Sequence, residues 1–207
     1  ASQNGFYEIA ETLIENGAKV EFRDKLYSTT ALIQAALGGH IDIVTLLLDK
    51  GADPNLQDSD GSTALFMASL KGYTDIVRLL LERGSEPDMK CNDGADAIFI
   101  ASLNGHTDVV KLLLERGAAL TDSDGTNAIV INAQDGLTAT VRALLYENQI
   151  PDLESLGRLT AVIASSQKGR LEVVRLLIKP GFNPIADQNT TKKTAFIRAA
   201  VSGHIEP

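Results

Sequence analysis

Apolar residues recur along this chain at helical spacing, in short segments that each end at a glycine. The segments 41–50 and 74–83 have the same pattern, and their leucine triplets, 46–48 and 79–81, lie 33 residues apart. Residues three or four apart share one face of a helix, so each segment predicts a helix with one apolar side. A shorter apolar segment precedes each of them and predicts a second helix in every unit.

Glycines mark the period of this pattern. Seven of them stand at the same point of successive units, at spacings of 34, 33, 33, 31, 33 and 34 residues, namely Gly5, Gly39, Gly72, Gly105, Gly136, Gly169 and Gly203. A second set ends the longer apolar segments, namely Gly17, Gly51, Gly84, Gly117 and Gly181. A fixed period in this range is typical of stacked units that bury their apolar faces against their neighbours.

Several motifs agree with the period. Gly-His precedes Ile-Asp-Ile-Val at 39–44, Asp-Gly precedes Thr-Ala-Leu at 60–65, and Leu-Leu-Leu-x-x-Gly-Ala-Asp-Pro-Asn fills 46–55. With these motifs the chain resembles the ankyrin repeat family over essentially all 207 residues. The resemblance implies an all-α solenoid of helix-turn-helix units with short β-hairpin-like finger loops. We expect one continuous, monomeric ankyrin repeat domain over 1–207, divided into a partial repeat 1–24, repeats at about 25–57, 58–90, 91–121, 122–154 and 155–188, and a partial repeat 189–207.

Some local features depart from the regular unit. Residues 1–4 are expected to end a first helix and residues 6–16 to form its partner. The loop before the fifth unit is two residues short, and Gly125 is expected in an Asp-Gly turn at its tip. In the sixth unit, residues 156–159 are expected in the finger. A change in loop length alters how adjacent fingers align, so we expect a local change of twist here.

Composition narrows the function classes. The formal charge is −8 with a pI near 4.9, which argues against a nucleic-acid partner because phosphate binding needs an excess of Lys and Arg. No apolar segment reaches the roughly 18 residues that a membrane span needs. The single cysteine, Cys91, fits a reducing compartment. These features favour an intracellular, cytoplasmic protein.

No residues form a pattern expected of an enzyme. The three histidines, His40, His106 and His204, each follow a marker glycine and therefore lie in different units, too far apart to share a metal ion. In the resembled family this histidine is a packing residue. Cys91 has no histidine near it in sequence, which favours an inert thiol. We therefore expect no catalytic residues, no metal and no cofactor.

The surface that stacking does not specify carries the candidate site. In the resembled family, partners bind the concave face made by finger tips and first helices. Leu37, Leu70 and Leu103 would line up across three units, either as an exposed apolar stripe or packed beneath the next finger. Tyr27 is the expected anchor, and acidic finger residues would favour a basic partner, although each such Asp also suits a turn. The predicted partner-binding residues are Leu26, Tyr27, Leu37, Ser59, Asp60, Leu70, Lys71, Asn92, Asp93, Leu103, Asn104 and Asp124.

Two functions fit this sequence. The first is a non-catalytic scaffold that binds a protein or peptide partner on its concave face. The second is a targeting or regulatory region of a larger enzyme, effector or channel. Charge is also uneven, because residues 1–167 hold 12 basic and 24 acidic residues whereas 168–207 hold 7 and 3. A contact with an anionic group near Lys168, Lys192 and Lys193 is a further hypothesis, beside the simpler reading of a solvated face.

Overall fold

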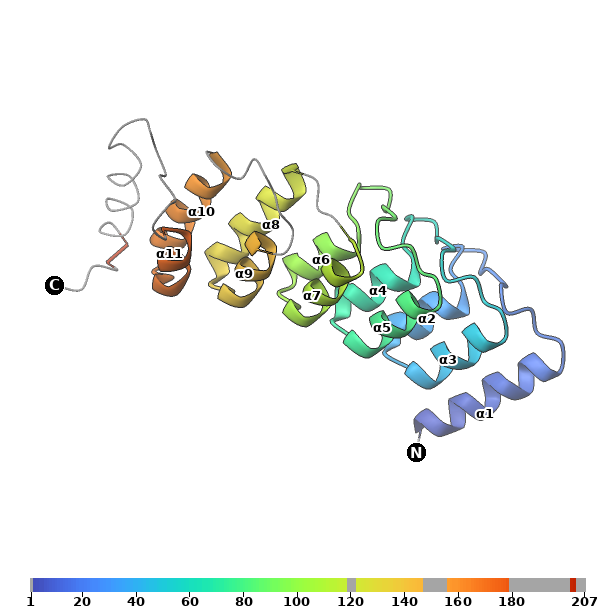
Figure 1. Ribbon diagram of the computed structural model, residues 1–207. Coiled ribbons are helices and arrows are strands. Elements are labelled where there is room, and N and C mark those ends of the chain that lie inside the picture. Colours follow the sequence, from blue (N-terminus) through green and yellow to red (C-terminus); the bar gives the residue numbers. More distant parts are fainter. Residues whose placement is uncertain (1, 119–121, 147–155, 179–201, 204–207) are drawn as a thin grey trace.

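The computed structural model describes residues 2–118, 122–146, 156–178 and 202–203 (Figure 1). In these residues all regular structure is helical, and the finger loops contain no strand. The helices are α1 (Ser2–Glu15), α2 (Ala31–Gly38), α3 (Ile41–Asp49), α4 (Ala64–Lys71), α5 (Thr74–Glu82), α6 (Ala97–Leu103), α7 (Thr107–Glu115), α8 (Asp122–Asp135), α9 (Thr138–Tyr146), α10 (Leu156–Gln167) and α11 (Leu171–Leu177). None of them combines the length and apolar character needed to cross a bilayer.

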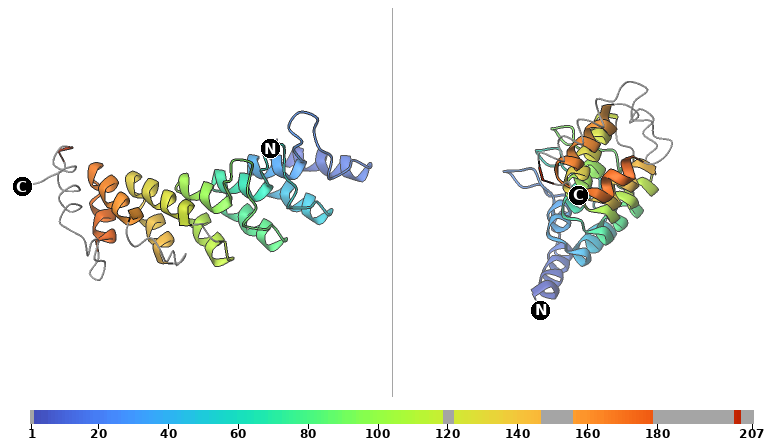
Figure 2. Two further views of the ribbon diagram at one scale, coloured as in Figure 1. Left: turned by 90° about the horizontal axis from the view of Figure 1, so that it is seen from above. Right: turned by 90° about the vertical axis from the view of Figure 1, so that its left-hand side faces the viewer.

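The helices stack in two layers, so the predicted all-α repeat solenoid is confirmed. The first helices of the units, α2, α4, α6, α8 and α10, pack in sequence order in one layer, and the second helices, α1, α3, α5, α7, α9 and α11, do so in the other. Figures 1 and 2 show an elongated stack in which each unit touches its neighbours, with loops projecting from one side. The two layers are the reason that no helix has to bury its apolar side alone.

Three first helices begin at a side-chain cap. Thr30 accepts a hydrogen bond from the backbone N–H of Ile33, and Thr63 and Asp96 do the same for the N–H groups three residues further on. Such a cap satisfies one of the N–H groups that a helix start leaves without a partner. These bonds fix where each finger ends and the stacked helix begins.

The core is a continuous seam of aliphatic side chains between the layers. Its largest members are fully buried and come from each unit between α2 and α11, for example Ile33, Leu65, Ile98, Leu113 and Leu144. Small alanines between them let neighbouring first helices approach closely. Aliphatic and alanine side chains thus fill the interior, as the absence of Trp suggests.

The first unit differs from its expected form. Residues 2–15 form one helix, α1, which runs through Gly5 instead of breaking there. The prediction of a helix end at residues 1–4 and a new helix at 6–16 was therefore wrong. A single glycine inside a helix lowers its stability by only about 1 kcal/mol, and the residues on either side of it are helix-compatible.

The fifth and sixth units also depart from expectation. Gly125 lies inside α8, and residues 156–159 lie in α10, so neither forms the predicted finger or Asp-Gly turn. The predicted finger residues Asp122 and Asp124 fall in the first turn of α8 instead. The two extended helices approach closely, because a Cβ on Gly157 would lie 2.6 Å from Cγ2 of Thr126. The space taken by a finger elsewhere is taken here by helix packing.

Candidate functional site

Three finger loops, finger 1 (residues 18–29), finger 2 (52–62) and finger 3 (85–95), are joined to one another by hydrogen bonds. The N–H of Ser59 donates to the carbonyl of Tyr27 at 2.8 Å, and the N–H of Asn92 donates to the carbonyl of Asp60 at 2.9 Å. The Asn92 side chain adds a bond to the carbonyl of Ser59. These contacts hold the three tips in fixed register.

Fingers 2 and 3 also touch closely at a glycine. Gly61 has φ +79°, and a Cβ there would lie 2.9 Å from the backbone nitrogen of Asn92 and 3.0 Å from Cα of Cys91. Any side chain at this position would therefore separate the two fingers. Finger 1 is one residue longer, and Ser28 adopts the left-handed conformation there with φ +55°.

Finger 1 carries large exposed apolar side chains, unlike its neighbours. Leu26 and Tyr27 are 74% and 59% exposed, as the prediction of a contact surface requires. Phe22, which the sequence reasoning missed, is 67% exposed in the same finger. The corresponding tips of fingers 2 and 3 carry the polar residues predicted for the site, Ser59, Asp60, Asn92 and Asp93, all of them exposed.

The leucine row, Leu37, Leu70 and Leu103, lies in the last turns of α2, α4 and α6. Because these three helices are neighbours in one layer, the three equivalent positions lie side by side. Each leucine is half-buried, and none belongs to the partly buried side chains that pack against the core. Lys71 and Asn104, each next to a row leucine in sequence, are exposed.

A second apolar row runs one helical turn before the leucines. Met67 and Ile100 are half-buried, and Ile131 of α8 is exposed. Met67 and Ile100 stand three residues before Leu70 and Leu103, and Ile131 stands three before Gln134 in α8, so each shares a helix face with that position. Met67 also packs against the core. That spacing was available in the sequence and could have identified them.

The predicted acidic ridge is less regular than expected. The Asp60 carboxylate has no hydrogen-bond partner in the described part of the chain, so it is free to contact a ligand. Asp93 instead accepts hydrogen bonds from the Cys91 thiol and the N–H of Ala95. Asp124 lies in α8 and not at a finger tip, so it does not continue the ridge as predicted.

The hydrogen bond to Asp93 also affects the pKa and the reactivity of the Cys91 thiol. Burial raises the pKa of this thiol to about 11, with further contributions from the hydrogen bond to Asp93 and from its negative charge. The same hydrogen bond lowers the pKa of the Asp93 carboxyl. A thiol with a raised pKa is a poor nucleophile, because the thiolate is the reactive form.

Residues after the marker glycines pack against the preceding unit. A Cβ on Gly72 would lie 2.5 Å from Nδ1 of His106, whose Nε2 is 3.1 Å from the carbonyl oxygen of Leu70. Arg170 takes the equivalent place two units further on and donates from Nε to the carbonyl of Gln134. His106 therefore has the packing role that the resemblance implied, and His204 lies outside the described residues. No group of three or more metal-ligating side chains is arranged around a common point in the described ranges.

The basic C-terminal end is only partly described. Lys168 is exposed, and Arg175 forms an exposed ion pair with Glu172 at 3.0 Å. Lys192 and Lys193 lie outside the described residues. The hypothesis of an anionic contact there stays a prediction.

A family model for ankyrin repeats, described as three copies, matches the chain over residues 1–91, 83–155 and 129–206. A glycerophosphocholine phosphodiesterase of Eremothecium gossypii is 44% identical over 55 residues, which is 27% of this chain and 4% of that protein. An ankyrin repeat and KH domain-containing protein of Caenorhabditis briggsae is 42% identical over 55 residues, 27% of this chain and 2% of the relative.

The Drosophila melanogaster ankyrin repeat and KH domain-containing protein mask is 45% identical over 51 residues. That match spans 25% of this chain and 1% of the relative. The matched segments of all three relatives are thus a small part of much longer proteins.

Proposed function

The chain belongs to the ankyrin repeat family, whose repeats are generally protein-interaction modules, and on that premise we propose that it is a non-catalytic scaffold for a protein or peptide partner. The proposed binding surface, which we call the finger face, consists of the tips of fingers 1–3 and the leucine row. The observation that carries the proposal is the hydrogen-bonded register of the three tips. A surface held in place before binding loses little conformational freedom when a partner docks.

The chemistry of the finger face indicates what kind of partner it suits. Leu26 and Tyr27 offer exposed apolar area at one end, and aromatic side chains are frequent anchors in interfaces. The free carboxylate of Asp60 favours a basic group on the partner, mainly through faster and more selective association. We therefore propose a partner segment that is apolar with basic residues, lying across the three fingers.

Replacement of two row leucines tests this proposal. The variant Leu70→Arg with Leu103→Arg is expected to lose the proteins that the wild-type chain captures from a cell extract. A matched control, Ile9→Arg with Leu13→Arg, places the same charges on exposed apolar positions of α1, in the other layer, and should capture them normally.

The helical content of each variant is measured by circular dichroism alongside the capture experiment. If the leucine variant keeps its helicity and still captures the same proteins, the finger face is not the binding surface. If it loses helicity, the leucines contribute to folding, and the single exposed replacement Tyr27→Arg then provides the test.

A second candidate function is a targeting or regulatory region of a larger protein. The observation that favours it is the size of the relatives, since the matches span at most 4% of their length and one relative is named as a phosphodiesterase. The full reading frame decides this point: a catalytic domain or membrane span in the same polypeptide would support it. The finger face would then recruit a substrate or an adjoining domain.

A further inference from the structure

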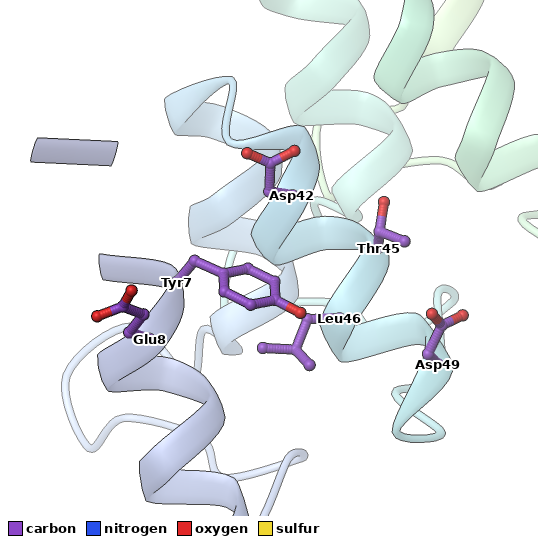
Figure 3. Close-up of a pocket in the computed structure, with 6 residues that line it drawn as sticks. All are labelled: Tyr7, Glu8, Asp42, Thr45, Leu46 and Asp49. Atoms are coloured by element: carbon purple, nitrogen blue, oxygen red, sulfur yellow. The ribbon is translucent and has the colours of Figure 1, made fainter. Parts of the chain in front are cut away.

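A groove lies between α1 and α3 in the second-helix layer, away from the finger tips. Its volume is about 460 Å³, and it is lined by Tyr7 and Glu8 from α1 and by Asp42, Thr45, Leu46 and Asp49 from α3. Figure 3 shows the Tyr7 ring reaching across from α1 towards Leu46, with the three polar residues of α3 in a line along that helix. The groove thus has an apolar floor, an aromatic wall and three carboxylates.

The second helices repeat a charge pattern that is broken at this groove. The fifth position of the helix is basic in α5, α7, α9 and α11, as Arg78, Lys111, Arg142 and Arg175. In α5 and α7 that cation lies three residues after one acid and four before another, so it offsets their charge on the same helix face, although it forms no direct ion pair with them in the described residues. In α3 the fifth position is Thr45, between Asp42 and Asp49, and no cation stands there.

The local contacts leave this deficit uncompensated. The Thr45 hydroxyl donates to the carbonyl of Ile41 and not to a carboxylate. Asp49 pairs with Arg83 at 2.6 Å, but Glu8 and Asp42 form no ion pair in the described part of the chain. Two carboxylates therefore flank the groove without a cation.

We propose that this groove binds an arginine side chain of a partner peptide, with the guanidinium in the place that Arg78 and its equivalents hold in the other units. The planar guanidinium can stack on the Tyr7 ring while donating hydrogen bonds to Asp42 or Glu8. Leu46, which is buried, supports the aliphatic part of the side chain. The proposal concerns the second-helix layer and does not depend on the finger face.

A short blocked peptide, Gly-Ser-Leu-Arg-Leu-Ser-Gly, serves as the probe in an NMR titration of the labelled chain. Saturable amide shifts are expected at α1 and α3, concentrated near Tyr7, Asp42 and Thr45. The same peptide with the neutral isostere citrulline should bind at least about tenfold more weakly, because charge-assisted hydrogen bonds are lost. Equal binding of the citrulline peptide, shifts spread over every acidic helix or no saturable shift overturns the proposal.

Variants of the chain itself provide the sharper test. Thr45→Arg restores the repeat's own cation and should abolish peptide binding, whereas the isosteric Thr45→Val should retain it. Asp42→Asn should weaken binding about tenfold, and the matched change in the next unit, Asp75→Asn, should leave it within about twofold because Arg78 is already present there.

Retained binding by Thr45→Arg, or an equal loss in Asp75→Asn, overturns the proposal. A peptide with lysine in place of arginine that binds as tightly overturns the guanidinium assignment. The finger-face variant Leu70→Arg with Leu103→Arg should bind the probe normally, which separates this site from the proposed function. Urea unfolding of each variant confirms that the stack is intact.

Discussion

Two regions of the stack share one period but connect their units differently. In residues 30–115 the first helices α2, α4 and α6 have 8, 8 and 7 residues and start at side-chain caps after a finger. In residues 122–177 the first helices α8 and α10 have 14 and 12 residues. The second helices α3, α5, α7 and α9 each have 9 residues.

The comparison teaches that stacking and finger formation have separate causes. The apolar seam has the same composition in both regions. Leu47, Leu80, Leu113, Leu144 and Leu177 are buried at the same position of successive second helices, from α3 to α11. The fingers instead need enough residues before the cap and a residue that adopts the left-handed conformation where the loop turns, as Ser28, Gly61 and Gly94 do. Where the loop before the fifth unit is two residues shorter, residues of the expected finger join the helix instead.

The largest effect is expected in the seam. Leu113→Ala removes a fully buried side chain and should lower the free energy of unfolding by about 3 kcal/mol. Leu13→Ala changes the equivalent residue of α1, which is 56% exposed, and should cost less than about 1 kcal/mol. Urea denaturation followed by circular dichroism measures both, and similar losses would show that α1 packs as tightly as the inner helices.

The second largest loss of stability is expected at Gly72, the marker glycine between two regular units. Gly72→Ala forces a residue with φ +75° to carry a Cβ against the His106 ring, and should lower the unfolding free energy by about 2 kcal/mol or more. Gly84→Ala is the control, since Gly84 has φ +91° but open space around it, and should cost about 1 kcal/mol. If the two variants lose the same stability, contact between units at His106 adds nothing.

A gain of stability is expected in the irregular region. Asn132 is fully buried in α8, its amide donates to the carbonyl of Ala128, and its Oδ1 has no hydrogen-bond partner among the residues that the structure describes. The regular units have alanine there, so Asn132→Ala should raise the unfolding free energy by about 1 kcal/mol. Ser165→Ala, at the equivalent position of α10 where the hydroxyl bonds to the carbonyl of Ala161, should be close to neutral. A loss in Asn132→Ala would mean that the amide fills space that alanine cannot.

The smallest effect on the fold is expected in the turn of finger 3, where the prediction concerns the reactivity of the Cys91 thiol. With its pKa raised from 9.0 to about 11, Cys91 should react with iodoacetamide at pH 8 roughly tenfold more slowly than an exposed thiol, because the smaller thiolate fraction outweighs the greater nucleophilicity of a more basic thiolate. Asp93→Ala removes both the charge and the acceptor, lowers the pKa of the thiol and should speed the reaction, although burial still slows it. An unchanged rate in Asp93→Ala would show that burial alone controls the thiol.

The residues of the candidate site differ in how well their positions could be predicted from the sequence. Leu26, Tyr27 and the polar tips of fingers 2 and 3 could be assigned because the repeat fixes their place in the unit, and the structure finds them exposed. Phe22 was missed because an apolar loop residue gives no sign of its exposure. The prediction placed Asp124 at a finger tip because the shortened loop has the same Asp-Gly residues as the other fingers. In the structure these residues are helical.

The sequence by itself determined the family, the period, the pairing of helices and the aliphatic seam, because these follow from residue spacing within one unit. Only the tertiary structure decided which glycines and carbonyls meet between units, that α8 and α10 extend at the expense of fingers, and that a groove opens between α1 and α3. Each of these depends on side chains about one repeat apart in sequence. Their contact distances are set by stacking, which no local pattern of residues records.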